Sequence, residues 1–159
     1  MAFNVANLRK DFPIFERTIR DGKKLVYLDS GATSQKPLSV IEAESNFYKF
    51  HNAAVHRGAH QLAEEATDAY EGARLKVAKF LGAREEQIVF TKGATESLNL
   101  IAYAMGNAAP GTRFALTSKD KIVVTEMEHH ANLIPWQQLA ERTGAQLSWF
   151  EVTPDGRLD

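Results

Sequence analysis

Residues 121–152 read KIVVTEMEHHANLIPWQQLAERTGAQLSWFEV, a stretch in which two apolar segments flank a more polar one. The apolar segments, residues 121–125 and 146–152, are rich in β-branched and aromatic side chains, which is typical of strands. We expect a helix between them, over residues 131–142. Strand, helix and strand in this order predict a βαβ unit, in which the two strands run parallel and the helix covers the sheet.

The stretch upstream predicts a second unit of the same kind. Residues 87–91 (QIVFT) are apolar and β-branched, as a buried parallel strand should be. They run through Lys92 and Gly93 into residues 95–105, where we expect a helix that Gly106 is placed to end. Two successive βαβ units place parallel strands in one sheet with helices over it. The expected fold class is therefore α/β with three layers.

The first half of the chain is expected to be mostly helical. Helices are predicted over residues 5–11, 38–50 and 63–81, and a short strand over residues 25–28. No internal repeat and no Gly/Ser-rich linker divides the chain. We therefore expect one continuous piece, with an N-terminal helical segment over residues 1–24 that leads into a domain over residues 25–159.

Composition narrows the classes of function. The chain is 44% hydrophobic and 25% charged with a net charge of -1, which is the balance of a soluble globular protein. Lys and Arg are interspersed with Asp and Glu, so no basic patch indicates a nucleic-acid partner. The absence of cysteine excludes disulfides and thiol catalysis within these residues. Residues 1–20 contain no unbroken apolar stretch, so we expect neither a secretory signal nor a membrane span, and a cytoplasmic location is the default.

The junction between residues 87–91 and the following helix is a candidate phosphate site. A helix N-terminus presents unpaired N–H groups and a positive dipole end, which suit an anion. Gly93 allows the backbone to approach closely, and Thr95 adds a hydroxyl. An equally weighted alternative is an ordinary capped helix in which Thr95 satisfies the first turn. Neither a Walker A sequence nor GxGxxG is present.

The hexapeptide 127–132 (MEHHAN) follows the strand at residues 121–125, so its side chains are expected at the same edge of the sheet as Gly93, Ala94 and Thr95. A flat imidazole of this pair, His129 or His130, could stack there on a planar aromatic ligand. The alternatives are a pair of capping or core histidines and, less favoured, a metal pair, because adjacent histidines rarely both point at one ion.

Two loops in the first half carry further candidates. Residues 52–60 contain His56, Arg57 and His60, which suit an anionic substrate or a partner subunit, with an ordinary solvated loop as the alternative. Residues 29–37 follow the predicted short strand and offer close backbone approach at Gly31, with a simple turn as the slightly favoured alternative.

Taken together, these segments resemble the start of the SUF-type (group II) cysteine desulfurases, members of the fold-type I aminotransferase superfamily. The resemblance lies in the order of the motifs as well as in their residues, and it extends from about Leu8 to Asp159. The matching segments are residues 12–13 (FP), 27–37 (YLDSGATSQKP), 54–58 (AVHRG), 93–99 (GATESLN), 127–132 (MEHHAN) and 135–136 (PW).

The resemblance implies a homodimer that binds pyridoxal 5'-phosphate (PLP), converts L-cysteine to L-alanine and passes a persulfide to a SUF acceptor protein for Fe–S cluster assembly. It implies that Gly93, Ala94 and Thr95 hold the cofactor phosphate and that His129 stacks on the pyridine ring. Gly31, Ala32, His56 and Arg57 would line the substrate region or the dimer contact. Many relatives carry Thr where Ala94 stands, so one phosphate hydroxyl is missing here.

The family's Schiff-base lysine, its aspartate for the pyridine nitrogen, its nucleophilic cysteine and its carboxylate-binding arginine lie later in the chain and have no match here. Residues 153–159 predict a turn that no closing element follows. A strand that we expect to be central would therefore lie at an edge of the sheet. We therefore expect residues 25–159 to be the N-terminal part of the large domain. We expect the 159-residue chain to be inert alone and to bind PLP weakly or not at all.

The sequence is also compatible with three other functions. A selenocysteine lyase or related PLP lyase would share the same motifs. A non-catalytic binding module could keep the phosphate pocket or the dimer surface. A metal-dependent hydrolase could be built on the five histidines, His51, His56, His60, His129 and His130.

Overall fold

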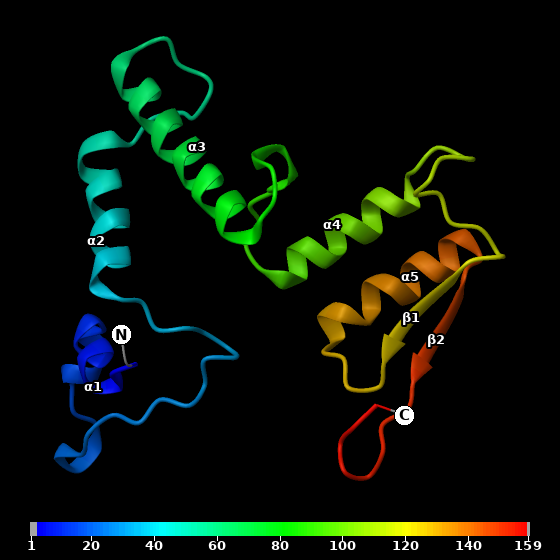
Figure 1. Ribbon diagram of the computed structural model, residues 1–159, viewed down its shortest axis with the longest axis horizontal. Helices are drawn as coiled ribbons and strands as arrows, with labels where there is room; N and C mark the ends of the chain where they lie inside the picture. Colours follow the sequence, from blue (N-terminus) through cyan, green and yellow to red (C-terminus); the bar gives the residue numbers. More distant parts are fainter. Residues whose placement is uncertain (1–2, 159) are drawn as a thin grey trace. The chain divides into compact units, whose positions relative to one another are not determined.

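The structure, a computed structural model, describes residues 3–158 (Figure 1). The chain divides into two compact units, Met1–Ile88 and Val89–Asp159. No linker in the sequence marks this division, which falls inside the stretch 87–91 that we expected to be one strand. Each unit is described by itself below.

The first unit is helical. Its elements are α1 (Val5–Leu8), the 3-10 turns η1 (Arg9–Asp11), η2 (Pro13–Glu16) and η3 (Arg20–Gly22), α2 (Leu38–Asn46), the π-helical turn η4 (Phe47–His51), α3 (Gln61–Leu81) and the 3-10 turn η5 (Glu85–Gln87). The three predicted helices are confirmed, although the first and second end as 3-10 and π turns. The helix α3 begins two residues earlier than predicted, because His60 occupies its N-cap.

The predicted end of α3 is confirmed. Gly82 follows the last turn with a φ of 66°, in the left-handed region that glycine adopts without steric cost. The N–H of Ala83 then donates to the carbonyl of Ala78 over 2.9 Å, which satisfies one of the free carbonyls of the last turn. Ala63, Ala66 and Ala78 are buried, whereas Phe80 in the last turn is 88% exposed.

The second unit contains the predicted βαβ unit. The helix α4 (Ala94–Gly106) precedes the strand β1 (Lys121–Thr125), the 3-10 turn η6 (His130–Asn132), the helix α5 (Ile134–Thr143) and the strand β2 (Gln146–Phe150). The strands are parallel, with Lys121 opposite Gln146 and Thr125 opposite Phe150. Pro135 lies in the first turn of α5, where its missing N–H costs nothing. Gly144 ends that helix with a φ of 77°.

The prediction of a second βαβ unit is wrong. Residues 88–91 form no strand, and the sheet of the described residues has two strands, β1 and β2. The predicted strand at residues 25–28 is also not formed, and an isolated bridge between Thr18 and Lys24 is nearby. An apolar segment becomes a strand only where a neighbouring segment accepts and donates its backbone hydrogen bonds, and neither segment joins the sheet of residues 3–158.

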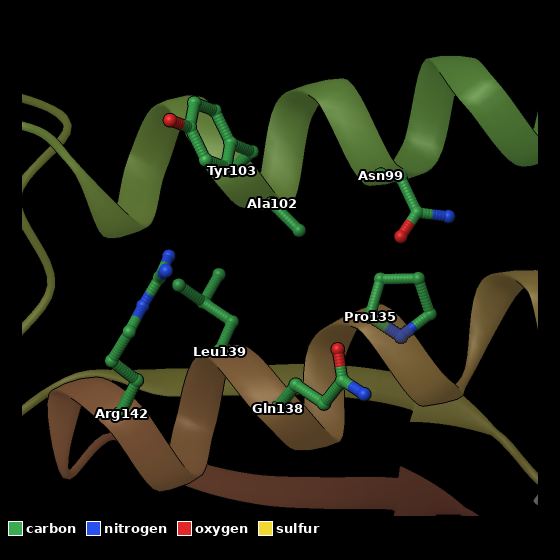
Figure 2. A pocket seen from close by; sticks show the side chains of 7 residues that line it. All are labelled: Asn99, Ala102, Tyr103, Pro135, Gln138, Leu139 and Arg142. Carbon is green, nitrogen blue, oxygen red and sulfur yellow. The ribbon is translucent and has the colours of Figure 1, made fainter.

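The core of the second unit lies between α5 and its neighbours α4 and β2. Leu139 is only 2% exposed, and Ala102, Val124, Pro135 and Ala140 are buried. Figure 2 shows Ala102 on α4 and Leu139 on α5 pointing into the space between the helices. A hollow of about 200 Å³ remains there, lined also by polar side chains, among them Asn99, Gln138 and Arg142.

None of the described helices is long and apolar enough to cross a membrane.

Candidate functional site

The candidate residues of the second unit lie at one end of it. Figure 1 shows the carboxyl ends of β1 and β2 at the same end of this unit as the amino ends of α4 and α5. The turn η6 also contacts α4. Parallel strands bind their ligands at this edge, outside their carboxyl ends. The structure therefore brings together the two segments that we singled out, residues 93–95 and residues 127–132.

The amino end of α4 is open. Gly93 is the N-cap residue, and no side chain caps the helix. The first backbone bond of the helix runs from the N–H of Ser97 to the carbonyl of Gly93 over 3.1 Å, so the N–H groups of residues 94–96 have no partner within the helix. Thr95 does not cap the helix, and its side chain makes no hydrogen bond within the described residues.

The space in front of this helix end fits a phosphate group. A hollow of about 480 Å³ is lined by Lys92, Gly93, Thr95, Glu96 and Asn99. A β-carbon placed on Gly93 would meet no atom within 4 Å, so the backbone is accessible. The free N–H groups, the Thr95 hydroxyl and the Lys92 ammonium all favour an anion. The carboxylate of Glu96 opposes it, although that carboxylate folds back to accept the backbone N–H of Lys92.

His129 lies in the loop that follows β1, with its imidazole exposed. The Nδ1 atom of His129 accepts the backbone N–H of Ala131 over 3.1 Å and so caps η6. A neutral imidazole that accepts through Nδ1 carries its proton on Nε2. The capping alternative is therefore found, and it orients the ring without covering it. The ring of His130 lies 6.3 Å away, tilted by 51°.

The loop that carries His129 is held by a carboxylate that we did not predict. Glu128 Oε1 accepts the hydroxyl of Thr125 over 2.9 Å, and Oε2 accepts the side-chain N–H of Asn132 over 2.7 Å. Asn132 in turn accepts the indole N–H of Trp136 over 2.9 Å. Positions 128, 132 and 136 are spaced by four, a pattern that could have indicated contacts along one helical face.

The first unit holds His56 in a left-handed conformation, with a φ of 62°. Such a backbone is uncommon outside glycine and persists where its surroundings hold it. Here the N–H of His56 donates to the Thr67 hydroxyl over 3.0 Å, and Nε2 lies 2.8 Å from a carboxylate oxygen of Glu71. The second oxygen of Glu71 accepts Arg74 Nε over 2.8 Å.

The other two histidines of the first unit also interact with α3. His51 Nδ1 lies 2.8 Å from Glu65, and the hydrogen bond from His51 is the largest cause that lowers the pKa of Glu65. His60 caps α3. Arg57 is exposed and makes no ion pair within the described part of the chain. Residues 3–158 contain no group of three or more side chains suited to hold a metal ion.

The loop with Gly31 and Ala32 forms a turn, the alternative that we favoured slightly. The N–H groups of Ala32 and Thr33 donate to the carbonyl of Asp29 over 3.1 and 3.2 Å. The hydroxyl of Tyr27 reaches the carbonyl of Thr33 over 2.6 Å and closes the turn from the other side. A β-carbon on Gly31 would meet no atom within 4 Å, so this backbone remains open to an approaching group.

Comparisons with known proteins identify the family of this chain. Residues 26–159 match the family Aminotransferase class-V. The chain is 57% identical to a probable cysteine desulfurase of Mycobacterium leprae over 98% of its own length and 37% of that protein's. The chain thus spans little more than a third of the length of such relatives.

Solved structures show the same relationship. The apo structure of a cysteine desulfurase from Thermococcus onnurineus NA1 matches all of this chain with a TM-score of 0.84 and 40% identity, over 36% of that protein. The Escherichia coli cysteine desulfurase CsdA, in an S-sulfonic acid form, matches 97% of the chain with a TM-score of 0.69. These likenesses confirm the expected fold, since the chain covers about a third of a fold-type I, PLP-dependent transferase. The chain belongs to the class-V aminotransferase family.

Proposed function

We propose that this chain is part of a PLP-dependent cysteine desulfurase, which converts L-cysteine to L-alanine and retains the sulfur as a persulfide. One observation carries the proposal: the open amino end of α4 and the carboxyl end of β1, which leads into the loop with His129, lie at the same end of the second unit. A phosphate at the first and a flat ring against the second are the two recognition elements that PLP requires. The cysteine desulfurase names of the relatives support the choice of substrate.

The residues of the second unit would bind and orient the cofactor. The backbone N–H groups of Ala94 and Thr95, with the hydroxyl of Thr95, would hold the phosphate, and Gly93 would let it approach. The imidazole of His129 would stack on the ring, in an orientation fixed by its bond to the N–H of Ala131. PLP supplies an electron sink for the bonds at the substrate's α-carbon.

The residues of the first unit would serve substrate binding or the contact between two copies in a homodimer. Arg57 offers an exposed guanidinium, which suits a carboxylate. His56 is fixed by Thr67 and Glu71, and Gly31 and Ala32 form an accessible turn. The persulfide would pass to an acceptor protein of the SUF system in the cytoplasm, for Fe–S cluster assembly.

Catalysis needs groups that these 159 residues do not provide. A thiolate must attack the substrate sulfur, and the chain contains no cysteine. No lysine here matches the family's Schiff-base lysine. We therefore propose that the 159 residues alone are inert and hold PLP weakly, and that activity requires the remaining part of the family's fold.

The test is sulfide release and L-alanine formation from L-cysteine by the complete gene product, reconstituted with PLP and a thiol reductant. We expect both products in equal amounts, together with the visible absorbance of protein-bound PLP. A protein that binds no PLP, or that binds it and leaves L-cysteine intact, would contradict the proposal. Faster selenide release from L-selenocysteine, with no sulfide, would instead identify a selenocysteine lyase.

A further inference from the structure

We propose that Glu128 is the positioning residue for His129: its carboxylate joins Thr125 to Asn132 across the loop and so holds the imidazole in one orientation. The proposal rests on the proposed function only in naming PLP as the group that the imidazole contacts. The orientation itself follows from the hydrogen bonds of the loop.

The direction of each bond in this network is determined by its chemistry. An indole N–H can only donate, so the atom of Asn132 that lies 2.9 Å from Trp136 Nε1 is the carbonyl oxygen. The amide nitrogen of Asn132 then points at Glu128 Oε2, 2.7 Å away, and must donate to it. The carboxylate of Glu128 therefore receives donors on both of its oxygens, since Thr125 donates to Oε1.

This network favours an ionised Glu128. A carboxylate that accepts two hydrogen bonds is stabilised in its charged form. The hydrogen bond from Asn132, followed by that from Thr125, lowers the pKa of Glu128. Glu128 is half-buried, so water competes less for the two donors than at an exposed side chain. These two hydrogen bonds join Thr125, Glu128 and Asn132 into a clamp, which is therefore intact at neutral pH.

The clamp brackets the histidine in sequence. Thr125 is the last residue of β1, Asn132 is the last residue of η6, and Trp136 lies in the first turns of α5. His129 is placed between these anchors, and its carbonyl accepts the N–H of Asn132 over 2.7 Å while its Nδ1 accepts the N–H of Ala131. Moving Asn132 would therefore shift both backbone groups that the histidine contacts.

The ring has no other support that would replace the clamp. His129 is exposed, and within the described residues its side chain contacts the N–H of Ala131 and the tilted ring of His130. An exposed imidazole with a single hydrogen bond would otherwise exchange between rotamers and between its two neutral tautomers. The clamp thus holds the loop between Thr125 and Asn132 in one conformation at the edge of the sheet.

The experiment compares Glu128→Ala with Glu128→Gln and Glu126→Ala in the complete gene product. The Gln side chain keeps the shape, can accept from Asn132 through its oxygen and can donate to the Thr125 hydroxyl, which accepts as well as donates. It therefore separates orientation from charge. Glu126 is a matched control, because it lies two residues away and its carboxylate accepts the N–H of Val152 over 2.9 Å, with no bond to the clamp.

The first readout is the imidazole nitrogen spectrum of His129 in protein labelled with ¹⁵N-histidine and assigned with His129→Gln. We expect one Nε2–H tautomer in the parent protein, in Glu128→Gln and in Glu126→Ala, and a mixture of tautomers in Glu128→Ala. A single unchanged tautomer in Glu128→Ala would overturn the proposal. If Glu128→Ala does not fold, Thr125→Val breaks one arm of the clamp with little change of shape and is judged by the same criterion.

The second readout is retention of PLP. Loss of a positioned stacking contact should weaken PLP binding by about two- to tenfold in Glu128→Ala, with full recovery in Glu128→Gln. Weakening in Glu128→Gln equal to that in Glu128→Ala would show that the charge acts and would overturn a positioning role. Because the tautomer spectrum is recorded without cofactor, failure of the parent protein to bind PLP would refute the proposed function and leave the clamp to be judged by the first readout.

Discussion

The imidazole of His56 lies with Nε2 2.8 Å from Oε1 of Glu71, across the gap between the loop at residues 52–60 and the helix α3. The same carboxylate accepts Arg74 Nε through its other oxygen. Glu71 therefore connects the loop to the helix and helps to hold His56 at its left-handed φ of 62°.

Replacing Glu71 should release this loop. We expect Glu71→Ala to lower the free energy of unfolding by about 1 kcal/mol or less, because the pair is partly exposed and screened. The larger effect should be local, seen as faster amide hydrogen exchange in residues 52–60 of the complete gene product. Asp68→Asn, which removes an exposed charge on the same helix, should change neither quantity. Equal exchange in the two variants would contradict the contact.

Gly58 should be intolerant of a side chain. A β-carbon on Gly58 would overlap the β-carbon of Ala63, which is 1% exposed and cannot move aside. We expect Gly58→Ala to destabilise the protein by about 1–3 kcal/mol, as overpacking does, measured by denaturant unfolding.

Gly72 provides the matched comparison for Gly58. It lies within α3, and a β-carbon there would meet no atom within 4 Å. Gly72→Ala should therefore stabilise the protein by about 0.5–1 kcal/mol through helix propensity. The prediction fails if the two Gly→Ala variants change stability in the same direction.

Protonation of the Asp120 carboxylate should lower the stability of the protein in acid. Its carboxylate accepts the backbone N–H of Thr117 over 2.8 Å and the Thr117 hydroxyl over 2.9 Å, and these bonds lower the pKa of Asp120 below its usual 3.8. A carboxyl with a lowered folded-state pKa stabilises the fold above its unfolded-state pKa, and this contribution is lost as pH falls through the folded-state pKa.

Asp120→Asn should therefore flatten the pH dependence of the unfolding free energy below about pH 4. Chemical denaturation at a series of pH values from neutral to acid measures this directly. Glu44→Gln removes a carboxylate that makes no hydrogen bond or ion pair within the described residues, so its profile should follow the parent's. A parent-like slope for Asp120→Asn would show that the Thr117 bonds do not contribute.

Removing a hydroxyl group from the proposed phosphate site should weaken PLP binding, and adding one should strengthen it. If Thr95 donates to the PLP phosphate, Thr95→Val should weaken PLP binding by about tenfold or more, the worth of a hydrogen bond to a charged group. Ala94→Thr, which introduces the hydroxyl that many relatives carry, should slow PLP loss. Both are measured by the rate at which PLP leaves the complete gene product. Unchanged rates in both variants would place the phosphate elsewhere.

Several elements were determined by local sequence. The strand β1 spans Lys121–Thr125 as predicted, and α3 and α5 end at Gly82 and Gly144, both with a positive φ. Such features depend on the side chains of a few neighbouring residues and on the conformations that glycine alone adopts without cost. The family resemblance was also readable, because motif order and identity are properties of the sequence itself.

The tertiary structure decided which segments and side chains find partners. Residues 25–28 and 88–91 have the composition of strands yet join no sheet within residues 3–158, because a strand requires a neighbour that local sequence does not specify. The same holds for the bonds of Glu71 to His56 and of Glu128 to Thr125 and Asn132. Residue types alone indicated a site at the edge of the sheet, but which carboxylate holds which histidine depends on distances of a few ångströms, and these are set only when the elements pack.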